Sequence, residues 1–347
     1  MICPADVAPF GDDFEVIGTF NPGAVRQDDR VALLVRVAER PLPVRPGFTG
    51  LPRWDANRQI TVDWVADDEL EFLDSRVICR KSDGLSRLTF TSYLKVFHSR
   101  DGVHFTGSGT SAEGAVFLPE SALEEFGVED SRITSLDGRF YITYVAVSRH
   151  GVATCLASTE DFRTFTRHGV IFGPENKDVV LFPERIAGQY VALHRPSGSA
   201  GFTRPEMWLA RSPDLIHWGQ HEHLLGVGTG WDSGRIGAGP PPIRVPEGWL
   251  VIYHGNARPS RPGEVGVYSA LAMLLAHDDP SRILARGMAP LLEPETDFER
   301  EGFVPNVVFP TGIVTEGSAL HVYYGAGDTC SAVVRLSLDE VLRSLRR

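Results

Sequence analysis

The sequence predicts an all-β protein, a five-bladed β-propeller with a short C-terminal helix. A repeated turn supports this prediction, because Asp101, Asp161 and Asp214 each stand four residues before an aromatic side chain. These aspartates are spaced by 60 and 53 residues. An aspartate that caps a tight turn is typical of an outer β-hairpin. Each one therefore indicates the same hairpin in a successive structural unit.

A second repeat alternates with the first. A turn residue followed by a strand-forming run begins at Gly138, Gly188, Gly248 and Ser318. Self-similarity at a spacing of roughly 50 residues, with about four strands in each unit, is the signature of a β-propeller. The run Val31–Ala38 supplies the matching strand of a first unit, which brings the count to five.

Helical spacing of apolar and charged residues occurs at the end of the chain, over Leu338–Leu345. Ser337 before it is a suitable N-cap, because its hydroxyl can accept a hydrogen bond from a backbone N–H of the first turn. A C-terminal helix of a few turns is therefore expected there.

The N-terminal part predicts one buried strand and then a region of short elements. Val31–Ala38 is too apolar and β-branched to be exposed on both faces. Arg36 interrupts it, and a charge inside a buried strand must meet an acid or a polar cavity.

Residues 41–58 are rich in Pro, Gly and Arg and are expected to form a long loop. Short strands at 59–65 and 76–79 and a longer one at 88–98 follow.

Composition and charge limit the function. A chain of 347 residues can bury a large core, and residues 1–347 are expected to form a single domain. The net charge of −11 argues against nucleic acid or an anionic membrane as partner, since both require a basic surface. Neither a signal peptide nor an apolar run of membrane-spanning length is visible. A cytoplasmic location is expected, and the question of whether the chain forms a homo-oligomer stays open.

The cysteines predict no special chemistry. Cys3, Cys79, Cys155 and Cys330 lie far apart in the sequence and lack the spacing of metal ligands. They are expected to be reduced structural thiols. No metal and no organic cofactor is expected.

The hairpin around Asp137-Gly138 is the strongest local prediction, since Asp-Gly between two strand-forming runs is typical of a hairpin turn. Asp130 stands at the entry of this hairpin, where a strand emerges from a loop. An aspartate at this position more often caps a turn than acts as a catalytic acid. In a propeller, however, Asp130 would face the central funnel where the inner strands converge. Asp130 is therefore a candidate acid of a carbohydrate site.

Other polar residues start or interrupt strands of different predicted blades, and such residues meet in the same funnel. Together with Asp130, these residues are Arg36, Arg132, Lys177, Arg195, His254 and Asp328. A lysine, an arginine and a histidine at equivalent strand ends would form a compact anion site, and phosphate has a fitting size. A solvated loop lysine and a hydrogen-bonded structural histidine are the alternative interpretations of Lys177 and His254.

Longer motifs occur in a recognisable order from about residue 20 to the C-terminus. They are Asn21-Pro22, Glu129-Asp130-Ser131-Arg132, Asn176-Lys177-Asp178, Leu181-Phe182-Pro183-Glu184, His194-Arg195-Pro196, the segments 237–243 and 248–255, and Tyr323-Tyr324-Gly325-Ala326-Gly327-Asp328. Together they resemble glycoside hydrolase family 130, the β-mannoside phosphorylases and β-1,2-mannosidases. The resemblance implies a five-bladed propeller as a single catalytic domain, in agreement with the count of repeats.

The resemblance implies an inverting enzyme with a small oligosaccharide as substrate and inorganic phosphate as co-substrate. It would cleave β-mannosides (β-1,4- or β-1,2-linked manno-oligosaccharides, or mannosyl-glucose) and release α-mannose 1-phosphate. Asp130 matches the catalytic acid, and the resemblance implies that it protonates the glycosidic oxygen through a substrate hydroxyl. Positions that contact phosphate are matched or neighboured by Asn176, Lys177, Arg195 and His254. Positions that hold the sugar are matched by Asn21, Arg36, Arg132 and Asp328.

Hydrolysis stays an alternative to phosphorolysis. Hydrolytic members use a glutamate base to activate water, and Glu175 and Glu184 are the candidate bases. Tyr93 stands where phosphorylases often have an arginine, and Glu175 where a cation would suit phosphate better, so both weaken the preference for phosphorolysis. A non-catalytic, glycan-binding propeller is a further alternative.

Overall fold

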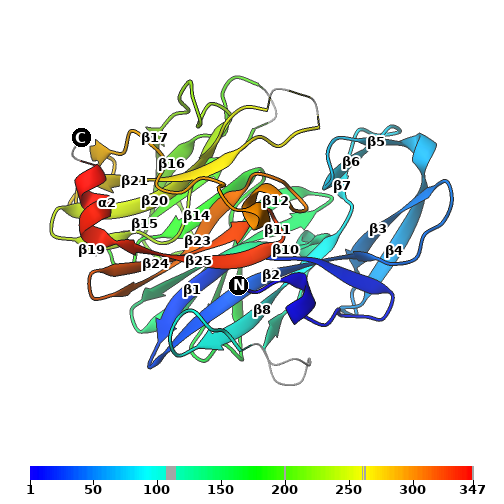
Figure 1. Ribbon diagram of the computed structural model, residues 1–347, viewed down its shortest axis with the longest axis horizontal. Coiled ribbons are helices and arrows are strands. Elements are labelled where there is room, and N and C mark those ends of the chain that lie inside the picture. The colour runs from blue at the N-terminus through cyan, green and yellow to red at the C-terminus, as the bar shows by residue number, and fades with distance from the viewer. Residues whose placement is uncertain (107–114, 199–200, 260, 262, 346–347) are drawn as a thin grey trace.

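The computed structural model describes residues 1–106, 115–198, 201–259, 261 and 263–345. This part of the chain is mostly β, with several small antiparallel sheets and a short C-terminal helix (Figure 1). No helix within it is long and apolar enough to cross a membrane.

Five of the sheets follow one another along the chain, and each begins with its innermost strand. The first contains β1 (Phe14–Gln27), β2 (Arg30–Pro41), β8 (Thr91–Ser99) and β9 (Val116–Phe117). The second contains β10 (Gly127–Leu136), β11 (Arg139–Ser148), β12 (Gly151–Thr159) and β13 (Thr166–Phe172). The third contains β14 (Asn176–Leu181), β15 (Tyr190–Pro196), β16 (Met207–Ser212) and β17 (Gly219–Leu225).

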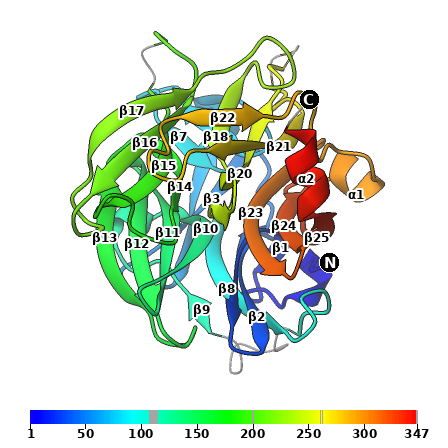
Figure 2. The same cartoon turned by 90° about the vertical axis from the view of Figure 1, so that its left-hand side faces the viewer.

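The fourth and fifth sheets complete the series. The fourth contains β18 (Arg235–Ala238), β20 (Gly248–Asn256), β21 (Tyr268–Leu275) and β22 (Ile283–Arg286), and β19 (Ile243–Val245) pairs with β20. The fifth contains β23 (Val308–Glu316), β24 (Ala319–Ala326) and β25 (Cys330–Ser337). Figure 2 shows the sheets following one another in chain order around a common centre. There β1 contacts β10, β10 contacts β14, β14 contacts β18, and β23 contacts β1.

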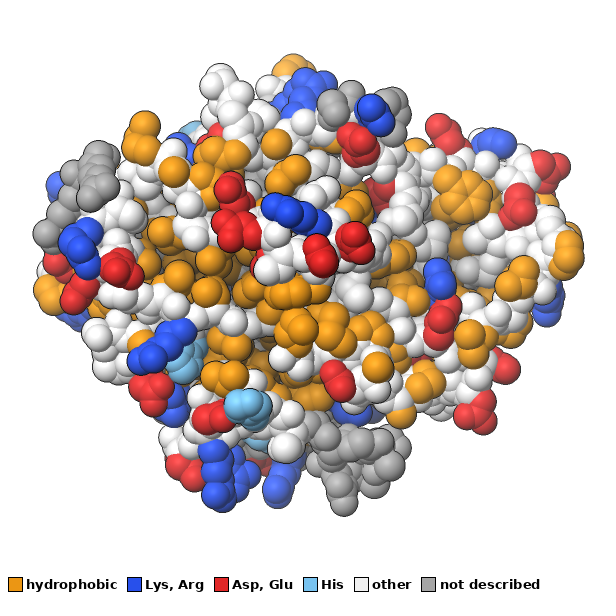
Figure 3. All heavy atoms as spheres, viewed as in Figure 1, with side chains coloured by type: hydrophobic (Ala, Val, Ile, Leu, Met, Phe, Trp, Pro, Cys, Tyr) orange, Lys and Arg blue, Asp and Glu red, His pale blue; other side chains and the backbone are white. Residues whose placement is uncertain are grey.

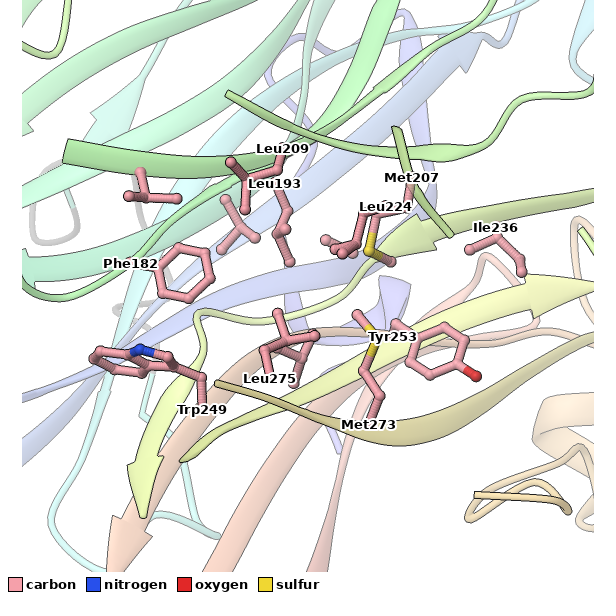
Figure 4. Close-up of a cluster of buried hydrophobic side chains, with 14 of the residues drawn as sticks. Phe182, Leu193, Met207, Leu209, Leu224, Ile236, Trp249, Tyr253, Met273 and Leu275 are labelled. Carbon is pink, nitrogen blue, oxygen red and sulfur yellow. The ribbon is translucent and has the colours of Figure 1, made fainter. Parts of the chain in front are cut away.

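Hydrophobic clusters fill the space between successive sheets. Between the third and fourth sheets, Phe182, Leu193 and Leu209 face Trp249 and Met273 (Figure 4). Comparable clusters lie between the other neighbouring pairs, including the fifth and first sheets. Burying a large apolar side chain contributes about 1.5–3 kcal/mol to stability. The clusters therefore stabilise the packing of each sheet against the next.

The repeated aspartates have the same geometry in three sheets, as the sequence predicts. Asp101 accepts hydrogen bonds from the N–H groups of the residues two and three positions later, at 2.9 and 2.8 Å. Asp161 and Asp214 do the same in the second and third sheets. The predicted hairpin turn also forms, because Asp137 and Gly138 have φ angles of 51° and 76° between β10 and β11.

The first sheet carries an insertion between β2 and β8. Its two small sheets contain β3 (Phe48–Trp54) and β4 (Ile60–Ala66), and β5 (Leu70–Phe72), β6 (Val77–Arg80) and β7 (Ser86–Leu88). The loop expected over residues 41–58 therefore contains a strand, β3, which the density of Pro, Gly and Arg had concealed. The insertion forms a lobe at the right of Figure 1, where hydrophobic side chains are scattered among charged ones (Figure 3).

The helical elements of the described chain are short and lie outside the strands. They are α1 (Asp297–Arg300), α2 (Leu338–Ser344) and the 3-10 turns Pro4–Asp6, Asp67–Glu69 and Ala122–Glu124. The predicted C-terminal helix is confirmed as α2, and the Ser337 hydroxyl accepts a hydrogen bond from the N–H of Glu340. Val341 and Leu342 of α2 pack on the fourth and fifth sheets.

The expectation of four reduced cysteines is wrong for one pair. Cys3 and Cys330 form a disulfide, with their Cα atoms 4.5 Å apart. The two residues meet because Ile2 pairs with Ser331 at the edge of the fifth sheet. Their separation of 327 residues along the chain hides this contact from any argument based on spacing. Cys79 and Cys155 are free.

Candidate active site

Three innermost strands carry the same irregularity at the same end. In β1, β10 and β14 the pairing register shifts at residues 21–22, 130–131 and 178–179. The first residue of each bulge, Asn21, Asp130 and Asp178, has a left-handed φ of 51°, 49° and 54°. Asn and Asp tolerate this conformation better than most residues do. A bulge re-aims the side chain that it carries, and here it directs three polar groups toward one cavity.

The cavity has a volume of about 370 Å³ and is lined by polar and aromatic side chains. The polar residues that line it are Asn21, Arg36, Arg76, Glu129, Asp130, Glu175, Lys177, Asp178, Arg195, Ser197, Arg235 and Asp328. The aromatic residues are Phe20, Phe90, Tyr268, Phe303 and Phe309. Planar apolar rings beside hydrogen-bonding groups are a suitable lining for a sugar.

Two glycines make room for the bulges. A Cβ atom at Gly325 would lie 2.0 Å from Oδ1 of Asn21, and one at Gly237 would lie 2.2 Å from Oδ2 of Asp178. Both distances are far below contact distance, so β18 and β24 need glycine at these two positions.

Asp130 is buried and held by two donors. Asn21 Nδ2 donates to its Oδ1 at 2.8 Å, and Arg36 Nη1 donates to the same oxygen at 3.0 Å. Burial alone would raise the pKa of the Asp130 carboxyl, but Arg36, Arg132, Lys177 and the Asn21 hydrogen bond hold it below its usual range. Without a bound anion, Asp130 is therefore ionised at neutral pH.

Arg36 is shared between two acids. Its Nη2 donates to Glu129 Oε1 at 2.6 Å, while Nη1 is bonded to Asp130. The guanidinium also lies 4.8 Å from the centre of the Phe20 ring. The interrupted strand thus places Arg36 both beside acids and in a cavity. Glu129 has a second cationic neighbour, Lys177, whose Nζ lies 3.4 Å from Oε2.

Asp178 is the single acid of a cationic cluster. It lies 2.6 Å from Arg195 Nη1, 3.0 Å from Arg132 Nη2 and 3.2 Å from His254 Nε2. Burial would raise the pKa of Asp178, but Arg195, His254 and Arg132 hold it well below its usual range. One carboxylate thus faces two permanent cations and a histidine, which leaves this side of the cavity positive.

Arg235 adds a further positive charge. It lines the cavity at the start of β18, and its charge lowers the pKa of Arg195, after the larger effect of burial. Within the described part of the chain, its side chain makes no hydrogen bond or ion pair, and its Nε is buried without a partner. A cation without a partner beside another arginine is the arrangement that binds an anion.

Asp328 completes the opposite side of the cavity. It sits in the turn between β24 and β25 with a φ of 46°. Burial raises the pKa of Asp328 to about 6, although Arg76 and Arg36 act to lower it. Asp130 and Glu129 raise it further, so three carboxyl groups share this region.

The cavity is therefore divided by charge into two arcs. Asp328, Asp130 and Glu129, which we call the acidic wall, come from the fifth and second sheets on either side of β1. Lys177, Arg195 and Arg235, which we call the cationic wall, come from the third and fourth sheets. Each wall is built from neighbouring sheets, so the division follows from the order of the chain around the centre.

The structure separates the sequence-predicted residues into three groups. Asn21, Arg36, Asp130, Glu175, Lys177, Arg195 and Asp328 line the cavity. Arg132 and His254 are fully buried behind it and reach it through Asp178. Asn176 and Glu184 are directed elsewhere.

Asn176 does not line the cavity, because side chains alternate along β14 and its neighbours Glu175 and Lys177 take the facing positions. Its Nδ2 lies 3.0 Å from Nδ1 of the buried His194. Burial and the neighbouring His221 lower the pKa of His194 to about 3, so this ring is neutral and can accept from the amide. A direct contact of Asn176 with phosphate is thus not favoured.

Glu184 is the wrong candidate for a base in this cavity. Its carboxylate pairs with Arg244 Nη1 at 2.6 Å, and Arg244 lines a different hollow at the other end of the inner strands. Glu175 does line the cavity, but its Oε1 accepts from the N–H of Val152 at 3.2 Å.

Tyr93, which had counted against phosphate, lies outside the cavity. Its ring packs in the core between the first and fifth sheets, and its hydroxyl donates to Glu39 at 2.9 Å. Tyr93 therefore carries no information about the anion site.

Sequence reasoning missed four polar residues that matter to the site: Arg76, Glu129, Asp178 and Arg235. Glu129 and Asp178 stand inside the motifs that carried the resemblance. Arg235 starts an inner strand, as Lys177 nearly does, so the same strand-start signal could have identified it. Arg76 comes from the insertion, and no local pattern indicates that the insertion reaches the cavity.

Comparisons with known proteins identify relatives of this chain. A family model described as β-1,4-mannooligosaccharide phosphorylase, of glycoside hydrolase family 130, matches residues 80–347. The β-1,2-mannobiose phosphorylase of Listeria innocua is 41% identical, over 99% of this chain and 96% of its own length. Its solved structure in complex with β-1,2-mannobiose superposes with a TM-score of 0.92.

More distant relatives have the same type of activity in their names. A 1,2-β-oligomannan phosphorylase of Thermoanaerobacter is 36% identical, over 73% of this chain and 81% of its own length. A β-1,4-mannooligosaccharide phosphorylase of Ruminococcus albus is 34% identical, over 70% of this chain and 73% of its own length.

Proposed function

Since this chain belongs to glycoside hydrolase family 130 and is a β-mannoside phosphorylase, we propose that it cleaves β-1,2-mannobiose with inorganic phosphate, giving mannose and α-mannose 1-phosphate. The linkage is supported by the Listeria innocua relative, which matches along nearly the whole chain. The β-1,4-specific relative of Ruminococcus albus is less similar and matches a shorter part.

The division of the cavity into an acidic wall and a cationic wall is the observation that supports this mechanism. An inverting reaction needs an acid on the leaving-group side of the sugar and a nucleophile on the opposite side. Asp130 in the acidic wall supplies the acid, and the cationic wall holds phosphate. Lys177 has one distant acid neighbour, Arg195 shares one with two other groups, and Arg235 has none among the described residues. A phosphate dianion would supply the missing negative charge.

Phosphate also provides the proton balance of the reaction. Hydrogen phosphate attacks the anomeric carbon, and the bond to the glycosidic oxygen breaks as Asp130 delivers a proton toward that oxygen. The proton released by the attacking phosphate restores the acid. Because the neighbouring cations hold the pKa of Asp130 low in the free cavity, an anion that neutralises them raises it. Phosphate binding thus prepares Asp130 as the acid.

The alternative of hydrolysis has weaker support. A hydrolase requires a carboxylate base on the side that phosphate would occupy, with room for a water molecule. Glu184 is paired with Arg244 outside the cavity, and Glu175 is bonded to backbone. On that side the three cations Lys177, Arg195 and Arg235 outnumber the carboxyl groups of Asp178 and Glu175, which favours an anionic nucleophile over water.

We further propose that the whole chain acts as one catalytic domain, a five-bladed β-propeller. The successive contacts of the inner strands, the return of β23 to β1 and the hydrophobic cluster between each pair of neighbouring sheets support this architecture. In this arrangement Asn21, Asp130 and Asp178 belong to blades one to three, and their bulges face the axis.

The decisive experiment measures sugar release from β-1,2- and β-1,4-mannobiose with and without phosphate. We expect phosphate-dependent release from β-1,2-mannobiose, with α-mannose 1-phosphate identified by ³¹P and ¹H nuclear magnetic resonance. Asp130→Asn should reduce turnover by about 10²–10⁴-fold, the usual contribution of a general acid. Equal release with and without phosphate would contradict phosphorolysis, and a preference for the β-1,4 linkage would contradict the proposed substrate.

A further inference from the structure

One arginine of the cavity does not come from the five sheets. Arg76 precedes β6 in the insertion, yet its side chain lines the cavity together with Asp328. Asp328 is 252 positions later in the chain, and the two charges interact. The insertion therefore contributes directly to the acidic side of the site.

Arg76 is held in place before any ligand arrives. Its Nη2 donates to Asp74 Oδ2 at 3.0 Å, and its Nε donates to Oδ1 at 3.3 Å. Asp74 is itself fixed, because its Oδ1 accepts from the N–H groups of Arg76 and Val77 at 2.8 and 3.2 Å. This turn orients the guanidinium and leaves Nη1 free of any hydrogen bond within the described chain. Pre-organisation of this kind reduces the entropy cost of binding.

The segment that carries Arg76 is attached to the loop at residue 303. Ser75 Oγ donates to the carbonyl oxygen of Phe303 at 3.1 Å, and Thr89 Oγ1 donates to the carbonyl oxygen of Ser75 at 2.9 Å. The rings of Phe90 and Phe303 meet edge to face at 5.5 Å. The insertion is thus a fixed wall of the cavity.

The direction of the reaction assigns a role to this wall. In an inverting displacement the leaving group departs on the side opposite the nucleophile. Phosphate lies on the cationic wall under the proposed function, so the leaving mannose lies toward Asp130, Asp328 and Arg76. A guanidinium presents several N–H donors in one plane, which suits the neighbouring hydroxyl groups of a sugar.

We propose that Arg76 is a specificity-determining residue that binds hydroxyl groups of the leaving mannose, and that the insertion of residues 42–90 thereby selects the acceptor sugar. This inference rests on the proposed function for the position of phosphate. It concerns a residue that lies outside the motifs shared with the family.

The reverse reaction tests the proposal, because the leaving mannose is then the acceptor substrate. In synthesis from α-mannose 1-phosphate and mannose, Arg76→Ala should raise the KM for mannose by about tenfold or more, as expected for a lost charged hydrogen bond. The KM for mannose 1-phosphate should stay within about twofold of the wild-type value. The KM for mannose of Arg76→Lys should lie between the values of the wild type and of Arg76→Ala, because lysine keeps the charge but lacks the planar set of N–H donors.

Arg80→Ala is the matched control, because Arg80 lies in β6 of the same insertion, pairs with Asp83 and does not line the cavity. It should leave both KM values unchanged. An unchanged KM for mannose in Arg76→Ala, or an equal rise of both KM values, would overturn the proposal while leaving phosphorolysis intact. Calorimetric titration of β-1,2-mannobiose without phosphate gives a test that needs no turnover, and equal Kd values for wild type and Arg76→Ala would also overturn it.

Discussion

At the scale of single residues, charge compensation separates the structural cations of the cavity from those that bind ligand. Arg36 and Arg132 are fully buried or nearly so, and each is paired with an acid at 3.0 Å or less. Arg235 has no partner within the described residues. Removal of a paired buried arginine would leave a carboxylate without its partner and destabilise the fold. Removal of Arg235 leaves no such group.

Arg235 should therefore affect phosphate and leave stability unchanged. We expect Arg235→Ala to raise the KM for phosphate by about 10–100-fold, the range of a charge-assisted hydrogen bond. The melting temperature should not fall, because no described group loses a partner. Arg204→Ala is the control and should change neither quantity, because Arg204 is exposed and does not line the cavity. A lower melting temperature with an unchanged KM would assign Arg235 a structural role.

Asp328 shows how a site residue can cost stability. Its pKa in the folded protein is raised to about 6, whereas an unfolded aspartate titrates near 4. Between these values the native state holds more protons than the unfolded state, so stability falls as the pH rises through this window. At neutral pH the folded protein therefore contains Asp328 as a buried carboxylate, although burial favours its protonated form.

The substitution Asp328→Asn should therefore stabilise the protein at neutral pH and weaken sugar binding. Relative to wild type, its unfolding free energy should increase by up to about 3 kcal/mol between about pH 4 and about pH 7. Urea denaturation at the two pH values measures this difference. The exposed Asp12→Asn serves as control and should show no such pH-dependent gain. A constant difference between wild type and Asp328→Asn at both pH values would contradict the assignment.

At the scale of elements, the bulges of β1, β10 and β14 connect the sheets to the chemistry. In a regular strand, successive side chains point to opposite faces of the sheet, so residues 21, 130 and 178 would follow the alternation of their neighbours. The extra residue at each bulge breaks this alternation, and the left-handed conformation of Asn21, Asp130 and Asp178 aims their side chains at the site. Asn and Asp at these positions thus both tolerate the left-handed backbone and supply polar groups to the site.

The left-handed conformation at Asn21 can be measured by comparing two substitutions. Asn21→Gly and Asn21→Ala both remove the hydrogen bond to Asp130, so their difference reports the backbone alone. We expect Asn21→Ala to be less stable than Asn21→Gly by roughly 1 kcal/mol, because a Cβ atom is disfavoured at positive φ. Urea denaturation of both variants gives the difference.

The same pair of substitutions at Thr166, an exposed position in β13 without positive φ, should give the opposite order. There alanine is favoured, since glycine loses more conformational freedom on folding. If alanine were the more stable residue at both positions, strain at Asn21 would not explain the sequence.

At the scale of the whole molecule, the N-terminal segment meets the fifth sheet at one edge. Ile2 pairs with Ser331 of β25, and the N–H of Thr19 in β1 donates to the carbonyl oxygen of Thr329 at 2.8 Å. The first and fifth sheets are joined there, close to Asp328. The Cys3–Cys330 disulfide fixes this junction covalently.

Loss of the disulfide should weaken the junction and the whole fold. The double variant Cys3→Ser/Cys330→Ser should lose about 2–5 kcal/mol of unfolding free energy, as expected when a native disulfide that closes a long loop is removed. Thermal unfolding of wild type with a reducing agent should give the same decrease. The reducing agent should have no effect on the double variant, because Cys79 and Cys155 are already free. Equal melting temperatures for oxidised and reduced wild type would contradict this role.

The sequence by itself determined the features that depend on local pattern. Turn-capping aspartates, the Asp137-Gly138 hairpin, the β-rich runs and the N-cap at Ser337 each act over a few residues, so their spacing predicts the number of units and the final helix. Asp130, Lys177 and Arg195 could be identified because they stand at the ends of strands whose convergence follows from the repeats. The motifs around them then identified the family.

Only the tertiary structure decided which of these groups face each other. Arg76 reaches Asp328 because the insertion folds over the cavity, and Cys3 meets Cys330 because the first and fifth sheets adjoin. Asn176 turns away and Arg235 turns in because side-chain direction depends on strand register. Charge balance in a cavity is a sum over groups from many segments. A sequence fixes which charges exist, and the fold fixes their distances, on which their energies depend.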